Sequence, residues 1–289
     1  MSLTISLFSG AIALLLAHYL PSKDKKLFSS LLGTLVFVGN ETFRELSSVK
    51  SIINPLHLGV QEYVFFYSCK IVSLKLLDFV LIQTWGGPPR GKMKLDRFDY
   101  VCLFSSSLLE TIFALNVINL CVINENIVWP LKEVNIYSIL IPIPIIFILD
   151  DVLYAQLHYI LHNKYLYPYI HRQHHKQYLP YRGYNDAGNE HPLEQILGEV
   201  LVYFSIRLVS LHMKVHVVSI LIQFILYASF AIANHLPQKV ETRIIGFLYE
   251  NKLHEIHHMK QSVNFSQNCP LWDILMGTYL ADTKERAAC

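Results

Sequence analysis

The sequence predicts an all-α fold, a bundle of helices embedded in a membrane. Hydrophobic residues make up 53% of the 289 residues and charged residues only 16%, and the mean hydropathy is +0.34. This composition is too apolar for an ordinary soluble protein. Twelve of the fourteen histidines lie between His158 and His258. We therefore expect a helical membrane bundle that carries a histidine-rich site.

Apolar segments of membrane length recur along the chain. They lie at residues 3–20, 61–84, 100–123, 135–157 and 215–234, with a shorter segment at 27–39 and a weaker one at 196–211. Since ~20 apolar residues span a ~30 Å hydrocarbon core, we expect about four to six segments to reach across or into the bilayer. The first segment is interpreted as a membrane helix, with a cleaved signal peptide as the alternative.

The segment before the first histidine pair predicts a helix that brings this pair to the membrane surface. A helix that begins near Ile136 covers the ~30 Å core in ~20 residues, which leaves His158 and His162 roughly 5 to 10 Å beyond the core. Pro142 and Pro144 each remove a backbone donor, so they are expected to kink this helix.

Basic residues predict which side of the membrane the histidines face. A Gly-Gly-Pro-Pro run at residues 86–89 is followed by a cluster of lysines and arginines, and the loops at 163–190 and 238–260 have a similar basic excess. Cytosolic loops of membrane proteins carry this excess. We therefore expect these loops, and the histidines within them, on the cytosolic side.

Three histidine clusters have the spacing of metal ligands. The first is an H-x-x-x-H pair and the other two have the form H-x-x-H-H; they comprise His158 and His162, then His171, His174 and His175, and last His254, His257 and His258. Residues three or four apart share one helix face, and imidazole is a common nitrogen ligand of transition metals. Because adjacent histidines cannot point the same way, the doublets predict two metal ions.

Asp151 is expected to support this site. It lies about two helical turns before His158, near the end of a membrane segment. A carboxylate at that depth is costly unless it is paired, so we expect it to accept a hydrogen bond from a ligand imidazole and fix its tautomer. Hydration by lipid headgroups is the alternative.

Composition and spacing disfavour three other classes. A net charge of +2 without a basic and aromatic run gives no reason to expect nucleic acid binding. The H-E-x-x-H pattern at His254–His258 also fits a zinc hydrolase with Glu255 as general base, but it leaves the upstream clusters unexplained. A metal transporter would carry more ionisable residues within segments such as 100–123 and 215–234.

The order of the motifs resembles the fatty acid hydroxylase superfamily, the integral-membrane sterol desaturases and hydroxylases. The resemblance covers about residues 145–282. It rests on the three histidine clusters in this order, on His191-Pro192-Leu193-Glu194 before the last one, and on a closing motif with Trp272-Asp273 and Gly277-Thr278-Tyr279.

The resemblance implies a set of site residues. The eight clustered histidines match the family's ligands, and His235 matches a further one. His191 is a ligand, a hydrogen-bonding partner of a ligand, or part of a structural turn. Trp272 and Asp273 are expected to surround the ligands, together with Asp151.

The resemblance also implies an activity. The family's enzymes are mostly multi-helix proteins of the endoplasmic reticulum membrane with a cytosolic di-iron centre, in which zinc is a possible substitute. They use molecular oxygen and electrons from a b-type cytochrome and its reductase. The implied substrate is a sterol or related lipid, with a fatty acyl chain as the alternative. We expect membrane helices and a cytosolic loop in residues 1–134 and the catalytic region in residues 135–282, within one integrated domain.

Overall fold

In a computed structural model, the chain forms two compact units, Met1–His57 and Leu58–Cys289. The structure describes residues 49–86, 94–239, 241–244 and 247–281. The expected membrane segments at 3–20 and 27–39, and most of the basic loop that begins at residue 86, lie outside the described residues. In the first unit the described element is the short helix α3 (Val49–Ile53).

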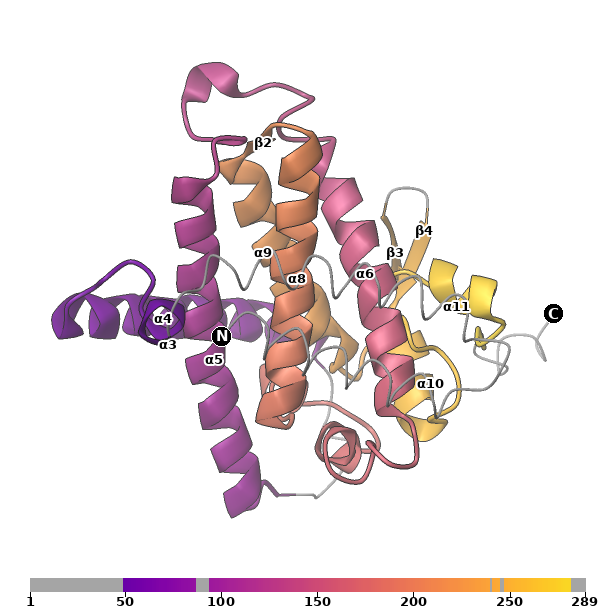
Figure 1. The fold of residues 1–289 in the computed structure, drawn as a ribbon. Helices are drawn as coiled ribbons and strands as arrows, with labels where there is room; N and C mark the ends of the chain where they lie inside the picture. Colours follow the sequence, from indigo (N-terminus) through magenta and orange to yellow (C-terminus); the bar gives the residue numbers. More distant parts are fainter. Residues whose placement is uncertain (1–48, 87–93, 240, 245–246, 282–289) are drawn as a thin grey trace. The chain divides into compact units, whose positions relative to one another are not determined.

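The second unit is built mainly from helices (Figure 1). The long ones are α4 (Val60–Trp85), α5 (Arg97–Ile123), α6 (Pro142–Leu161), α8 (Pro192–His212) and α9 (Val217–Asn234). The short ones are η1 (Leu131–Glu133), η2 (His171–Lys176), α7 (Tyr184–Ala187), α10 (Asn251–Met259) and α11 (Leu271–Met276). Strand β1 (Ile127–Val128) pairs in parallel with β2 (Val215–His216), and β3 (Glu241–Ile244) pairs antiparallel with β4 (Phe247–Glu250). The sequence had not predicted these strands.

Four of the described helices, α5, α6, α8 and α9, are long and apolar enough to cross a membrane. The chain is therefore a multi-pass membrane protein. Helix α4 covers the predicted segment at 61–84 but is not among the four, since it carries Glu62, Lys70, Lys75 and Asp78. Each charge held in hydrocarbon costs about 2.5 to 3.5 kcal/mol.

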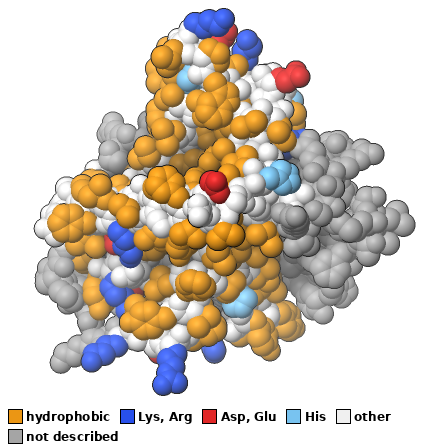
Figure 2. Space-filling model, turned by 90° about the vertical axis from the view of Figure 1, so that its left-hand side faces the viewer, with side chains coloured by type: hydrophobic (Ala, Val, Ile, Leu, Met, Phe, Trp, Pro, Cys, Tyr) orange, Lys and Arg blue, Asp and Glu red, His pale blue; other side chains and the backbone are white. Residues whose placement is uncertain are grey.

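The four membrane-length helices enclose an apolar core. Side chains from each of them meet there, including Leu120, Ile146, Ile206 and Ile220, which are at most 3% exposed. On the described part of the face drawn in Figure 2, hydrophobic side chains predominate, and most of the lysines and arginines lie toward the upper and lower ends. This pattern is that of a bundle whose sides meet lipid and whose ends meet water.

Helix α6 differs from the prediction at its start. It begins at Pro142 and not near Ile136, and the residues between them form turns. Pro142 and Pro144 lie in its first turn, where backbone N–H groups have no partner within the helix, so the prolines begin the helix and do not kink it. Twenty residues then extend ~30 Å, which keeps His158 in the last turn of the membrane helix.

Candidate metal centre

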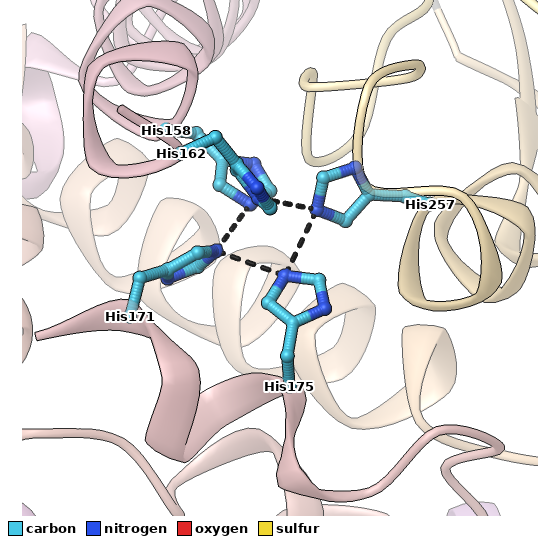
Figure 3. A group of neighbouring side chains, drawn as sticks. All are labelled: His158, His162, His171, His175 and His257. Atoms are coloured by element: carbon cyan, nitrogen blue, oxygen red, sulfur yellow. Dashed lines mark hydrogen bonds between the residues drawn. The ribbon is translucent and has the colours of Figure 1, made fainter. Parts of the chain in front are cut away.

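The end of α6 and two short helices bring five histidines to one point (Figure 3). Two come from the last turn and C-cap of α6, two from η2 and one from α10. Each offers one ring nitrogen, and these nitrogens all lie within 4.8 Å of one another. This first histidine group consists of His158, His162, His171, His175 and His257.

A second histidine group lies beside the first. Its ring nitrogens also lie within 4.8 Å of one another, and all of its side chains are buried. The members are His174, His235, His254 and His258. The rings of His175 and His258, one from each group, have centroids 4.5 Å apart. The adjacent histidines of each H-x-x-H-H motif thus lie in different groups, and the buried cluster is suited to a di-metal site.

The second motif achieves this separation with a helix type that its spacing did not predict. We expected an α-helical face, but His171–Lys176 forms the 3-10 helix η2, with three residues per turn. His171 and His174 are therefore stacked, with ring centroids 5.5 Å apart. His175 is rotated by about a third of a turn from His174, which turns it toward the first group.

Backbone carbonyls determine which nitrogen is protonated in four of the rings. Nδ1 of His158 donates to the carbonyl of Phe265, that of His257 to the carbonyl of Val263, and that of His235 to the carbonyl of Ala231, each at 2.7 Å. Nδ1 of His258 donates to the carbonyl of Gln177 at 3.0 Å. A carbonyl has no proton to donate, so the hydrogen is on Nδ1 and the Nε2 atom of each neutral ring presents a lone pair.

These lone pairs face other ring nitrogens at short range. Nε2 of His158 lies 3.0 Å from Nε2 of His171, whose own Nδ1 is 2.6 Å from Glu194. Nε2 of His257 lies 3.1 Å from Nε2 of His175. Between His158 and His171 both facing nitrogens carry lone pairs, and two lone pairs this close repel unless a cation lies between them. Nitrogens that bind one ion at ~2.1 Å and at right angles are ~3.0 Å apart, so the first histidine group fits a metal ion.

Buried nitrogens without hydrogen-bond partners support the same conclusion for both groups. Both ring nitrogens of His174, and Nδ1 of His175 and of His254, are buried and unpaired among the described residues. A buried polar atom without a partner costs about 1 to 3 kcal/mol. A metal ion bound by His174 would remove part of that cost.

Burial keeps the rings neutral and ready to bind a metal. It lowers the pKa of His162 to about 2. Burial first, and the neighbouring imidazoles second, hold the pKa of His171, His174 and His257 well below the ordinary value. Because only unprotonated imidazole binds a metal ion, these rings present ligands at any physiological pH.

Glu194 is a site residue whose contact the sequence did not reveal. Its Oε1 accepts a hydrogen bond from Nδ1 of His171 at 2.6 Å, and its side chain is only 3% exposed. A carboxylate in this position fixes the ring's orientation and makes it a stronger metal ligand. Glu194 also lies with Glu190 and His174 in a third cluster whose donor atoms are within 4.8 Å of one another. In the sequence, Glu194 was indicated only by its place in the His-Pro-Leu-Glu element.

The prediction that Asp151 accepts a hydrogen bond from a ligand imidazole is wrong. Its carboxylate accepts hydrogen bonds from the backbone N–H groups of Asn268 and Cys269, at 2.8 and 3.1 Å, and not from an imidazole. The loop after α10 has no helix or strand partner for these donors, and a carboxylate from α6 supplies one. Asp151 therefore anchors a loop next to the metal centre.

Asp273 holds the same loop from α11. Its carboxylate accepts from the backbone N–H groups of Phe265 and Ser266 at 2.7 and 2.9 Å, and from the hydroxyl of Thr278 at 2.7 Å. The carbonyl of Phe265 in turn orients His158. The closing motif thus reaches the first histidine group through the backbone of this loop.

Besides Asp151 and Asp273, two further predicted site residues lie outside both groups. His191 is the N-cap of α8, and its Nδ1 accepts from the backbone N–H of Leu193 at 3.2 Å. The structure thus agrees with the structural turn among its three interpretations. Trp272 lies in α11, and its indole N–H is buried without a hydrogen-bond partner among the described residues.

Four membrane-length helices with two adjacent groups of inward-facing histidines define a multi-pass membrane protein with a di-metal site. Residues 143–278 match the fatty acid hydroxylase family model, and the chain carries a domain of this family over those residues. The match contains every histidine of both groups. The protein is therefore a histidine-rich membrane oxidoreductase. No solved structure matches the chain.

Proposed function

We propose that the protein is a di-iron, oxygen-dependent oxidoreductase that hydroxylates or desaturates a sterol or a related lipid, or oxidises one of its methyl groups. The observation that carries this proposal is the division of nine histidines into two adjacent groups, each H-x-x-H-H motif serving both. The first group offers more ligands than the four of a structural zinc site. A fatty acyl chain is the alternative substrate.

The histidine groups would hold one iron each, and bound iron supplies the redox chemistry with oxygen that an unactivated C–H bond requires. The chain's own residues prepare the site. The carbonyls of Phe265 and Val263 aim the lone pairs of His158 and His257 inward. Burial of the rings excludes bulk water, which strengthens every electrostatic interaction at the centre.

The electron donor in this proposal is a b-type cytochrome with its reductase. The chain has no G-x-G-x-x-G nucleotide motif and no C-x-x-C-H haem motif, so it needs a partner to receive electrons from a nicotinamide. The exposed Lys164, Arg172 and Lys260 near the histidine-bearing segments suit an acidic cytochrome. Lys176 and Lys252 lie in the same segments but are already paired with acidic residues.

The location follows from the same residues. The basic loops favour a cytosolic site, and the resemblance to lipid-modifying enzymes favours the endoplasmic reticulum. A cysteine inserted beside the exposed Lys164 is expected to react with a membrane-impermeant maleimide in sealed microsomes without detergent. Labelling that requires detergent would place the site in the lumen.

Elemental analysis of the purified protein tests the proposed cofactor. About two irons per chain are expected in wild type, and fewer in His174→Ala, which removes a ligand of the second group. His191→Ala serves as the control, because this histidine belongs to neither group. A single zinc per chain in protein expressed with ample iron would overturn the proposal and favour a zinc hydrolase.

A further inference from the structure

A polar stripe on α6 leads from the metal centre into the membrane bundle. Asp150, Tyr154 and His158 are spaced four residues apart and share one face of the helix. The rings of Tyr154 and His158 have centroids 5.4 Å apart. Asp150 is only 3% exposed, yet its carboxyl has no hydrogen-bond or ion-pair partner among the residues that the structure describes.

Other polar groups from α9, from α8 and from the segment before α8 lie near this stripe. The side chain of Tyr227 on α9 lies near Asp150, Glu190 and Glu199. The side chain of Tyr154 lies near Glu194, Glu190 and Tyr227. Several hydrogen-bonding groups therefore converge where α6, α8 and α9 meet, a region in which membrane helices otherwise pack apolar side chains.

The charges of this region exclude most lipid headgroups. Neither α6 nor α9 contains a lysine or arginine, and Arg207, which α8 does contain, lies eight residues, ~12 Å, beyond Glu199. Lys70 of α4 is bonded to Glu110 at 2.9 Å. A fatty acid carboxylate or a phosphate would be buried among carboxyl groups here, with no cation from α6 or α9 to pair with it.

A neutral hydroxyl is the group that this arrangement suits. A hydroxyl donates a hydrogen bond to a carboxyl oxygen and accepts one from a tyrosine. An unpaired carboxyl in a membrane interior is costly, and such residues mark substrate sites and pathways. We propose that Asp150, with Tyr154 and Tyr227, binds a hydroxyl group of the lipid substrate. This inference rests on the proposed function and specifies its substrate.

The spacing of residues along α6 also indicates which part of the lipid is oxidised. Asp150 and His158 are eight residues apart, which is ~12 Å along the helix axis. A lipid whose hydroxyl is held by Asp150 therefore presents to the histidine groups a carbon many bonds from that hydroxyl. Oxidation of a methyl group on the carbon next to the hydroxyl does not fit this spacing.

A binding experiment with matched lipids tests the site. Wild-type protein in nanodiscs is titrated with two pairs of tritiated lipids that differ in one hydroxyl, cholesterol with cholest-5-ene and octadecan-1-ol with octadecane. At least one alcohol is expected to bind ~2- to 10-fold more tightly than its deoxy partner, the factor for a hydrogen bond between neutral groups. Asp150→Leu and Tyr154→Phe should reduce that preference without weakening the deoxy lipid.

Controls separate the site from the fold and from the metal centre. Ser106→Ala changes another buried polar side chain, on α5, and should keep the preference. If Asp150→Leu does not fold, Asp150→Asn replaces it and should lower the preference by a smaller factor. Equal affinities within both pairs, or a full preference in the Asp150 variant, would overturn the proposal. Since the readout is binding, iron content measured in parallel tests the proposed function separately.

Discussion

The two nitrogens of each clustered imidazole have different partners. In His158 and His257, Nδ1 donates to a backbone carbonyl and Nε2 faces the other rings. The inward face of the site thus presents lone pairs, which a bound cation would stabilise. Two histidines that are adjacent in the sequence therefore cannot replace each other as ligands.

Replacing His175 with alanine is expected to remove metal and activity together. Its Nε2 lies 2.9 Å from that of His171 and 3.1 Å from that of His257, so no other side chain can occupy its place. Iron content should fall below one half of wild type, and lipid oxidation should become undetectable. The control His191→Ala loses a helix cap, costs about 1 kcal/mol of stability and keeps its iron. Full turnover in the His175 variant would contradict the metal assignment.

Glu255→Gln is expected to retain substantial activity. Glu255 is buried next to His254, but its carboxylate is bonded to Lys252 and belongs to none of the candidate metal-binding groups among the described residues. Turnover within about tenfold of wild type, measured with intact iron content, fits this contact. Complete loss of activity with the metal retained would instead identify Glu255 as the general base of a hydrolase.

At the scale of elements, a loop and two helices cooperate to position the first histidine group. The loop between α10 and α11 supplies the carbonyls of Val263 and Phe265, and carboxylates from α6 and α11 bind its backbone N–H groups. The spacing of the histidines predicted that they are metal ligands, but it did not predict the contribution of this loop. A contact between residues more than 100 positions apart, such as Asp151 with Asn268, leaves no periodic pattern in the sequence.

Asp273→Asn is expected to weaken metal binding without unfolding the bundle. The amide replaces one carboxylate oxygen with a donor, so the N–H of Phe265 or of Ser266 loses its acceptor and the carbonyl that orients His158 shifts. Substitution of a residue that orients a metal ligand lowers the metal affinity about 10- to 100-fold. Competition with a chelator measures this loss, and Thr278→Val should show a smaller one. An unchanged affinity would contradict the role given to the loop.

At the scale of the whole molecule, the buried histidines make stability depend on pH. In the unfolded chain their pKa is ~6.5, whereas burial lowers that of His162 to about 2 and those of His171 and His257 further below the ordinary value. As the pH falls below ~6.5, the unfolded state binds protons that the native state does not. Stability is then lost by up to about 1.4 kcal/mol per pH unit for each such histidine.

Thermal unfolding of the metal-free protein in detergent tests this dependence. The Tm should be nearly constant from pH 8 to 7 and should fall progressively from pH 6.5 to 5. The His191→Ala variant should give the same profile, because its ring is not part of the buried groups. A Tm that does not change down to pH 5 would show that the rings are protonated in the folded protein.

The proposed electron transfer involves the molecule as a whole, because the donor must reach it from outside. Purified enzyme with oxygen, reduced nicotinamide and lipid is expected to be inactive until a b-type cytochrome and its reductase are added. If exposed basic residues such as Lys164, Arg172 and Lys260 attract the cytochrome, moderate salt should slow the coupled reaction. Product formed without the two partners would contradict this account.

Much of the membrane bundle followed from local pattern. Apolar segments near 100–123 and 215–234 coincide with α5 and α9, because the length of an apolar run is a property of consecutive residues. The start of α6 did not follow, because the sequence between Ile136 and Pro142 is as apolar as a helix but forms turns. Its carbonyls and side chains pair with other segments, as when the carbonyl of Ser138 accepts from the N–H of His216.

The sequence by itself determined the family of the domain at residues 143–278, the membrane class and the identity of the clustered histidines, since all of these are carried by composition and by short spacings. Only the tertiary structure decided how the histidines divide between two groups and which carbonyls orient four of their rings. It also decided that Asp151 binds a loop and that His191 caps α8. The physical reason is that spacing orients side chains within one helix, whereas a metal site needs the ends of several helices to meet, and long-range packing sets that meeting point.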